Sequence, residues 1–249
     1  TWFGQGKGKE PVKAVNNVSF DINRGEVLGL VGESGSGKST IGRSILRLVP
    51  VTSGKVLFDG IDLTALEGRE LKTMRRRMQM IFQDPFASLN PRMTVYDTLA
   101  EPLLLHGIDN RKTVAQGVLK LMDDVGLARA FVRKYPHEFS GGQRQRIAIG
   151  RALATRPDFI VADEPVSALD VTIQAQILEL MQQLSREYGL TMLFVSHDLA
   201  VVRHLADRIL VLYKGEVVEQ GSGDDLFERP QQAYTQQLLS SIPGRSLLA

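Results

Sequence analysis

A short apolar strand that leads through a glycine-rich loop into a helix is the strongest constraint on the fold of this chain. Residues 27–31 form an uninterrupted apolar run, and residues 32–40 then read GESGSGKST. Ile41, Ile45 and Leu48 follow at helical spacing. A strand that enters a helix in this way is typical of an α/β sheet with parallel strands.

The loop matches the pattern G-x-x-x-x-G-K-[ST] in the strand–loop–helix context that this pattern requires. Its glycines let consecutive N–H groups point at phosphate oxygens, and the helix N-terminus adds partial positive charge. Lys38 supplies a full charge to the β- and γ-phosphates, and the Ser39 hydroxyl is placed to bind Mg²⁺. A glycine-rich turn without a ligand is the alternative, which the flanking strand and helix disfavour. The predicted nucleotide contacts here are Gly32, Ser34, Gly35, Gly37, Lys38, Ser39 and Thr40.

Further apolar runs at 159–162, 192–195 and 209–212 predict more buried parallel strands. The helical spacing of Ile177, Met181, Leu184 and Tyr188 between them favours a doubly wound sheet. Polar-bounded segments at 12–22 and 55–59, with a hairpin turn at 213–216, predict an antiparallel β flap. Residues 87–156 carry no strand pattern and predict an inserted helical lobe. The catalytic α/β lobe would then comprise residues 1–86 and 157–249.

Composition excludes several function classes. The 249 residues are 43% apolar, which supports a sizeable core. Lys and Arg number 30 against 28 Asp and Glu, so the balance gives no indication of nucleic acid as a partner. Cysteine is absent, which removes disulfides and thiolate chemistry. No apolar run reaches the ~18 residues of a membrane span, so a membrane role would require a partner. Thr1 is not an initiator Met, and we expect that upstream sequence was trimmed.

Two acids follow the strand predicted at 159–162. Because ligands bind beyond the carboxyl ends of parallel strands, we expect Asp163 and Glu164 beside the phosphate loop. Asp163 is the expected partner of Mg²⁺ through water, since Mg²⁺ gives up its waters reluctantly. Glu164 can polarise the attacking water as general base. An acid pair that caps a helix before Pro165 is the alternative, but Lys38 upstream favours the catalytic interpretation.

The segment FSGGQRQR at residues 139–146 resembles the signature of the ATP-binding-cassette (ABC) family, usually written LSGGQ. Phe139 replaces the usual Leu and keeps an apolar side chain. Ser140 is expected to cap the helix that follows. Gly141 and Gly142 would leave backbone N–H groups bare, which makes a second anion site. A capped helix alone would not explain two glycines in its first turn, because glycine weakens a helix.

The resemblance implies a P-loop NTPase of the RecA-like, doubly wound type, with one ABC ATPase domain over residues 1–249. Gln83 is similar to the glutamine that senses the γ-phosphate, and His197 is similar to the switch histidine. The loop SALD, ending at Asp170, resembles the one that reaches a partner subunit. Phe3, or else Trp2, is the expected adenine-stacking residue, unless this segment is a trimmed end. The implied sites are catalytic Glu164, His197, Gln83 and Lys38; metal-binding Ser39, Gln83 and Asp163; and nucleotide-binding Phe3, Ser140, Gly141, Gly142, Gln143 and Asp170.

Residues 83–95, QDPFASLNPRMTV, and the tail AYTQQLLSSIP at 233–243 are similar to the importer branch for dipeptides and oligopeptides, which also serves nickel and glutathione. The resemblance implies ATP and Mg²⁺ as ligands and a head-to-tail pair with a second ABC ATPase subunit or a fused half. It also implies transmembrane permease subunits, an extracytoplasmic solute-binding protein indirectly, and no nucleic acid. The expected location is the cytoplasmic face of a bacterial inner membrane. The cargo stays open, because ATPase subunits do not contact it.

Two other functions are compatible with a phosphate loop. A soluble relative acting in DNA repair, chromosome organisation or translation would carry a long coiled coil or a second cassette, and the sequence shows neither. A small-molecule kinase would need a lid for the phosphoryl acceptor and has no use for SGGQ at 140–143.

Overall fold

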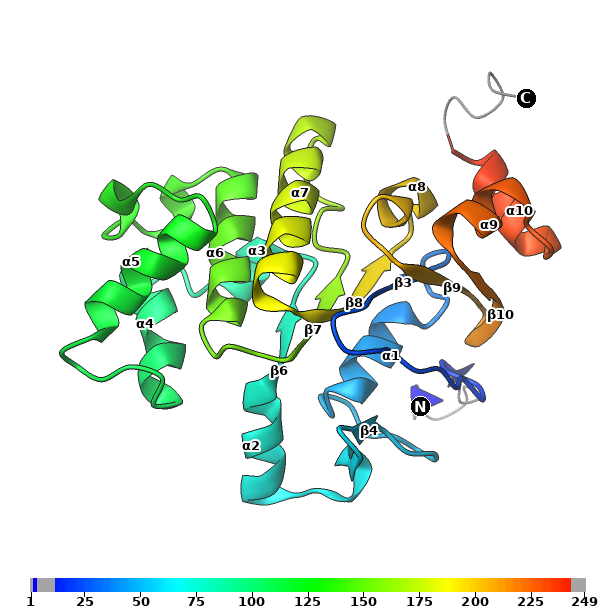
Figure 1. Cartoon of the computed structure of the whole chain (residues 1–249), viewed down its shortest axis with the longest axis horizontal. Helices are drawn as coiled ribbons and strands as arrows, with labels where there is room; N and C mark the ends of the chain where they lie inside the picture. The colour runs from blue at the N-terminus through cyan, green and yellow to red at the C-terminus, as the bar shows by residue number, and fades with distance from the viewer. Residues whose placement is uncertain (1, 4–11, 243–249) are drawn as a thin grey trace. The chain divides into compact units, whose positions relative to one another are not determined.

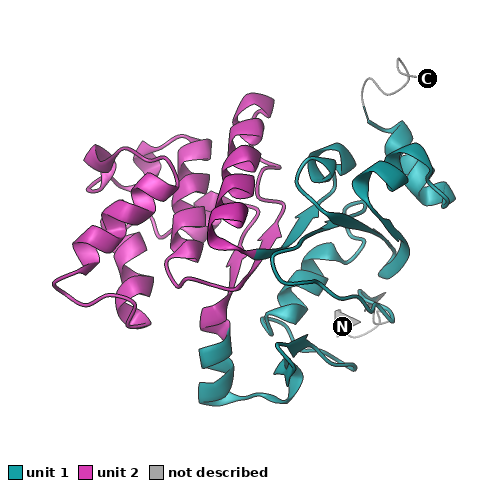
Figure 2. Cartoon of the chain, viewed as in Figure 1, with its two compact units in different colours: residues 1–74, 191–249 teal, residues 75–190 magenta. Residues whose placement is uncertain are grey.

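The computed structural model describes residues 2–3 and 12–242. The chain forms two compact units, shown in two colours in Figure 2. Residues 1–74 and 191–249 make the first unit, and residues 75–190 make the second. The predicted lobes have boundaries at residues 86 and 156, which differ from those of the two compact units, and the division into lobes remains a prediction. None of the helices in the described part has the length and apolar character that a membrane span requires.

Four strands form the sheet of the first unit in the order β10-β9-β3-β8. Strand β3 (Val27–Val31) pairs in parallel with β8 (Thr191–Ser196) and with β9 (Arg208–Tyr213). Strand β10 (Glu216–Gly221) is antiparallel to β9. Figure 1 shows α1 (Lys38–Ile45) and α8 (Leu199–Arg203) on opposite faces of these strands.

The remaining elements of the first unit are short. They are β1 (Trp2–Phe3), β2 (Val12–Lys13), β4 (Leu57–Phe58), β5 (Ile61–Asp62), the 3₁₀ turn Leu63–Ala65, α9 (Gly223–Glu228) and α10 (Ala233–Ser240). Helix α2 (Gly68–Arg77) continues into the second unit.

Helices dominate the second unit. Its two strands, β6 (Met78–Ile81) and β7 (Phe159–Asp163), pair in parallel. Helix α6 (Gly141–Leu153) contacts β6, α3, α4, α5 and α7, so it forms the centre of the unit. The other helices are α3 (Pro85–Ser88), α4 (Val95–Leu105), α5 (Val114–Asp124), the 3₁₀ turns Arg129–Phe131 and Pro136–Glu138, and α7 (Val171–Tyr188).

The predicted buried strands are confirmed, and all five residues of β3 and of β7 are buried. The antiparallel pieces are smaller than expected. Only Val12–Lys13 of the segment 12–22 is a strand, and β10 joins the edge of the main sheet. The prediction that the helix after the glycine-rich loop extends to Leu48 was wrong. Helix α1 stops at Ile45, Arg47 takes φ of 55°, and Leu48 is 47% exposed.

Strand β3 and helix α8 approach closely at Gly29. A Cβ placed on this buried glycine would lie 2.1 Å from Val202 Cγ1 and 3.1 Å from Ala206 Cβ. The absence of a side chain therefore lets α8 pack on the strand that leads into the glycine-rich loop.

Replacing Gly29 with Ala should destabilise the protein by about 1–3 kcal/mol, because the new methyl group would overpack the β3–α8 contact. Urea denaturation would measure the change. Gly221→Ala is the matched control, since a Cβ there meets its nearest atom, Leu226 Cγ, at an ordinary 3.6 Å. Equal stability of the two variants would contradict the packing argument.

Candidate functional site

The glycine-rich loop at 32–40 is shaped by close backbone contacts within the first unit. A Cβ on Gly32 would lie 2.2 Å from the carbonyl oxygen of Leu212, and one on Gly37 would lie 2.3 Å from that of Ala14. Gly37 also has φ of +107°, a conformation that L side chains rarely adopt. A Cβ on Gly35 would meet no atom within 4 Å. Gly32 and Gly37 therefore pack closely against the backbone of the first unit, whereas the tip of the loop at Gly35 has room for a ligand.

Lys38 is the first residue of α1, and only 4% of its surface is exposed. Its ammonium donates hydrogen bonds to the carbonyl oxygens of Gly32 at 2.7 Å and Glu33 at 2.9 Å. The cation thus lies within the curl of the loop, where it can also attract phosphate. Ser39 and Thr40 follow in the first turn of α1, and both are half-buried.

His197 directly follows β8 and is exposed. Asp198 begins α8, because its carboxylate accepts the N–H of Ala200 at 2.8 Å. Since β3 and β8 are parallel neighbours, the glycine-rich loop and His197 leave the sheet of the first unit at the same edge. This is the placement that the sequence predicts for a histidine near the phosphates.

The second unit brings Gln83 and Glu164 together. Each residue lies just beyond one of the two parallel strands β6 and β7, so both side chains emerge at the same edge. The Gln83 amide donates to Glu164 Oε2 at 3.1 Å and lies 3.4 Å from Ser167 Oγ. The Ser167 hydroxyl donates to the carbonyl oxygen of Glu164 at 3.1 Å. Gln83 therefore holds the carboxylate predicted to act as base, and Ser167 holds the backbone of the same residue.

Asp163 and Glu164 are adjacent in sequence but differ in environment. Asp163 ends β7 with only 1% of its surface exposed, whereas Glu164 is half-buried. Glu164 also takes φ of 47°, in the left-handed region that disfavours residues with a Cβ. A strained backbone of this kind is typical of functional positions.

The signature segment forms the predicted cap of α6. Gln143 N donates to Ser140 Oγ at 3.3 Å, and Ser140 N donates to Gln143 Oε1 at 3.1 Å. This reciprocal capping box satisfies two N–H groups of the helix start. The glycines serve packing as well. A Cβ on Gly142 would lie 2.4 Å from Ile173 Cγ2. Sequence reasoning assigned these glycines to anion binding and missed their second role.

Asp170 has a structural role that the sequence did not indicate. Its carboxylate accepts the N–H of Ile173 at 3.1 Å and so caps α7. The predicted contact of Asp170 with a nucleotide remains a prediction. Phe3 belongs to β1, but its side chain lies outside the described part of the structure, and adenine stacking likewise remains a prediction.

The comparison with protein families decides the identity of the fold. The family model described as ABC transporter matches residues 15–167, which include the phosphate loop, the signature and both acids. The chain belongs to the ABC transporter family. The resemblance read from the signature is thereby confirmed, and with it the P-loop NTPase fold.

Two curated relatives of this ABC-family chain are named as ATP-binding proteins for peptide import and oligopeptide transport. It is 58% identical to a putative peptide import ATP-binding protein of Brucella ovis, over 94% of this chain and 74% of the relative. It is 56% identical to the oligopeptide transport ATP-binding protein OppF of Bacillus subtilis, over 93% and 77% of the two chains.

A solved structure of the same family has the same fold. The ATP-binding cassette MJ0796, in a dimeric post-hydrolysis state bound to ADP and Pi, superposes with a TM-score of 0.79 at 34% identity. The match covers 89% of this chain and 94% of MJ0796.

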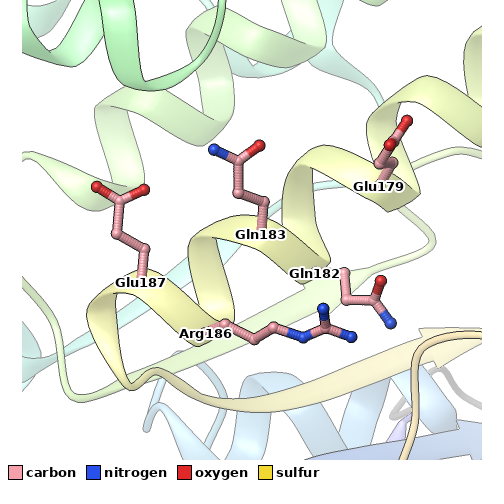
Figure 3. Close-up of a pocket in the computed structure, with 5 residues that line it drawn as sticks. All are labelled: Glu179, Gln182, Gln183, Arg186 and Glu187. Atoms are coloured by element: carbon pink, nitrogen blue, oxygen red, sulfur yellow. The ribbon is translucent and has the colours of Figure 1, made fainter.

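The positive φ of Glu164 predicts that a glycine variant at this position is more stable than an alanine variant. Glu164→Gly should be more stable than Glu164→Ala by about 1 kcal/mol, because only glycine adopts positive φ without strain. Both variants lose the same carboxylate, so the difference in urea denaturation isolates the backbone. Gln183, on the polar face of α7 drawn in Figure 3, is the control. There glycine should be less stable than alanine by about 1 kcal/mol, and the same order at both positions would refute the strain argument.

Proposed function

We propose that this chain is the ATP-hydrolysing subunit of an ABC importer for peptides. The observation that carries the proposal is Glu164 at the ends of two parallel strands: its backbone takes positive φ, its carboxylate accepts a hydrogen bond from Gln83, and its carbonyl accepts one from Ser167. The names of the relatives support peptide import, and MJ0796 with ADP and Pi supports hydrolysis. A soluble role in DNA repair or translation is not favoured by either comparison.

The phosphate loop fits the triphosphate of ATP. Its open tip at Gly35 leaves room for phosphate oxygens, and the loop enters the N-terminus of α1, where anions are favoured. Lys38, whose ammonium bonds to the carbonyls of Gly32 and Glu33, would attract the β- and γ-phosphates. Gly32, Ser34, Gly37 and Thr40 would complete the cradle.

Ser39 and Asp163 fit Mg²⁺ because a hydroxyl and a carboxylate are the hard oxygen donors that this ion prefers. We infer that these two residues hold the ion, Asp163 through water, with Gln83 as a further ligand. The ion would neutralise charge on the phosphates.

Glu164 would act as general base. Its carboxylate would accept a proton from the water that attacks the γ-phosphorus, while the Gln83 amide keeps the carboxylate oriented. His197 would donate a hydrogen bond to the γ-phosphate. Inorganic phosphate leaves as the P–O bond to ADP breaks, and the proton passes from Glu164 to solvent.

The signature segment would act on a second cassette. The start of α6 is partly exposed, and its capping box uses the N–H groups of Ser140 and Gln143. The N–H groups of Gly141 and Gly142 would bind the ATP of a head-to-tail partner, with Ser140 and Gln143 beside it. Permease subunits would place the complex at the cytoplasmic face of a bacterial membrane, with a solute-binding protein delivering the cargo outside.

Glu164→Gln should retain ATP binding and lower hydrolysis about 10²–10⁴-fold, because the amide cannot take the proton. Phosphate release by the purified transporter complex measures turnover, and equilibrium binding measures ATP affinity. Glu179→Gln removes an exposed carboxylate from α7 and should change neither quantity. Hydrolysis by Glu164→Gln at the unmutated rate would show that another group is the base.

The importer assignment has its own test. The tagged chain, extracted from native membranes in mild detergent, should copurify with integral permease subunits and a second cassette ATPase. In proteoliposomes, peptide with its binding protein should then stimulate ATP hydrolysis more than nickel or glutathione. Recovery of soluble proteins alone would overturn the transport function but leave ATP hydrolysis standing.

A further inference from the structure

One peptide unit of the phosphate loop is held from both ends. The carbonyl oxygen of Gly32 accepts a hydrogen bond from the Lys38 ammonium at 2.7 Å. The N–H of Glu33, in the same peptide unit, donates to the hydroxyl oxygen of Tyr234 at 2.9 Å. The C=O and N–H of a trans peptide point in opposite directions, so Lys38 and Tyr234 grip this unit from opposite sides.

Tyr234 reaches the loop from α10, near the end of the described chain (Figure 1). Its ring packs on that of Tyr213, at the end of β9, with 4.3 Å between the ring centroids. Glu219 of β10 anchors the segment before α10, because its carboxylate accepts the N–H groups of Gln231 at 2.7 Å and Gln232 at 3.0 Å. The tyrosine hydroxyl is thus fixed by the same sheet that carries the loop.

The hydrogen bond from Glu33 to Tyr234 restrains a flexible peptide unit, the one between Gly32 and Glu33. Gly32 has no side chain to restrict the rotation of the peptide that follows it. Rotation of that peptide would turn its carbonyl away from Lys38 and redirect the N–H of Glu33. The bond to Tyr234 opposes this rotation. Burial raises the pKa of Tyr234, so its hydroxyl stays neutral near neutral pH.

We propose that Tyr234 is a positioning residue that holds the phosphate loop ready for ATP. The inference rests on the proposed ATP-binding function of that loop. Without the tyrosine hydroxyl, part of the binding free energy would be spent on ordering the Gly32–Glu33 peptide, and ATP would bind less tightly. Helix α10 thereby becomes part of the nucleotide site, although it carries none of the phosphate-binding motif.

The test compares two tyrosines that form one aromatic pair. Tyr234→Phe keeps the ring and removes the hydroxyl that accepts the Glu33 N–H. Tyr213→Phe removes a hydroxyl from the other ring and leaves that bond in place. Isothermal titration of the whole chain gives the dissociation constant for ATP, and the purified transporter complex gives KM and kcat.

Tyr234→Phe should raise the ATP dissociation constant and KM about 3–10-fold, the range set by one neutral hydrogen bond. Its kcat should stay within about twofold, since the contact is the same in ground state and transition state. Tyr213→Phe should match the unmutated protein in all three. Equal ATP affinity of the two variants, with a lower melting temperature for Tyr234→Phe, would reduce Tyr234 to a structural role and overturn the inference. Absence of ATP binding by the unmutated chain would overturn the proposed function as well.

Discussion

The phosphate loop of the first unit depends on backbone contacts that leave no room for side chains. Gly215 N, in the β9–β10 turn, donates to the carbonyl oxygen of Ser36 at 2.8 Å. A Cβ on Gly32 would collide with the Leu212 carbonyl of the same hairpin. Because loop and hairpin meet through main-chain atoms, the hairpin fixes the curl of the loop. The same hairpin orients Tyr213, and through it the ring of Tyr234.

In the second unit, neighbouring side chains and strands hold the Glu164 carboxylate in one orientation. Two short parallel strands deliver Gln83 and Glu164 to a common edge, and the Ser167 hydroxyl bonds to the Glu164 carbonyl. Positive φ at Glu164 costs about 1 kcal/mol or more. Strand β7, which leads directly into Glu164, is buried over its whole length. The strained backbone of Glu164 lowers the stability of the fold, but it fixes the orientation of the residue proposed to activate water.

Much of this architecture could be predicted, and the exceptions have physical causes. The strand at 27–31 was predicted with its observed bounds, since a strand buried on both faces is apolar throughout. Leu48 was misplaced because α1 ends at Ile45 and Arg47 then takes positive φ, with its guanidinium bonded to the carbonyl of Leu63. That partner is distant in sequence and has no local signal. Gly142 was assigned to anion binding alone because its contact with Ile173 was likewise invisible.

The sequence by itself determined the chemistry of this ABC-family chain. The phosphate loop, the acids at the end of β7 and the signature are short local motifs, and each functional group follows from a few neighbouring residues. Only the tertiary structure decided how those groups are held. Tyr234 meets the Glu33 N–H across 201 positions of the chain. No local pattern records such a contact, because packing of distant elements creates it. The sequence of residues 233–243 resembles a segment of the importer branch, but only the fold shows that the Tyr234 hydroxyl bonds to the phosphate loop.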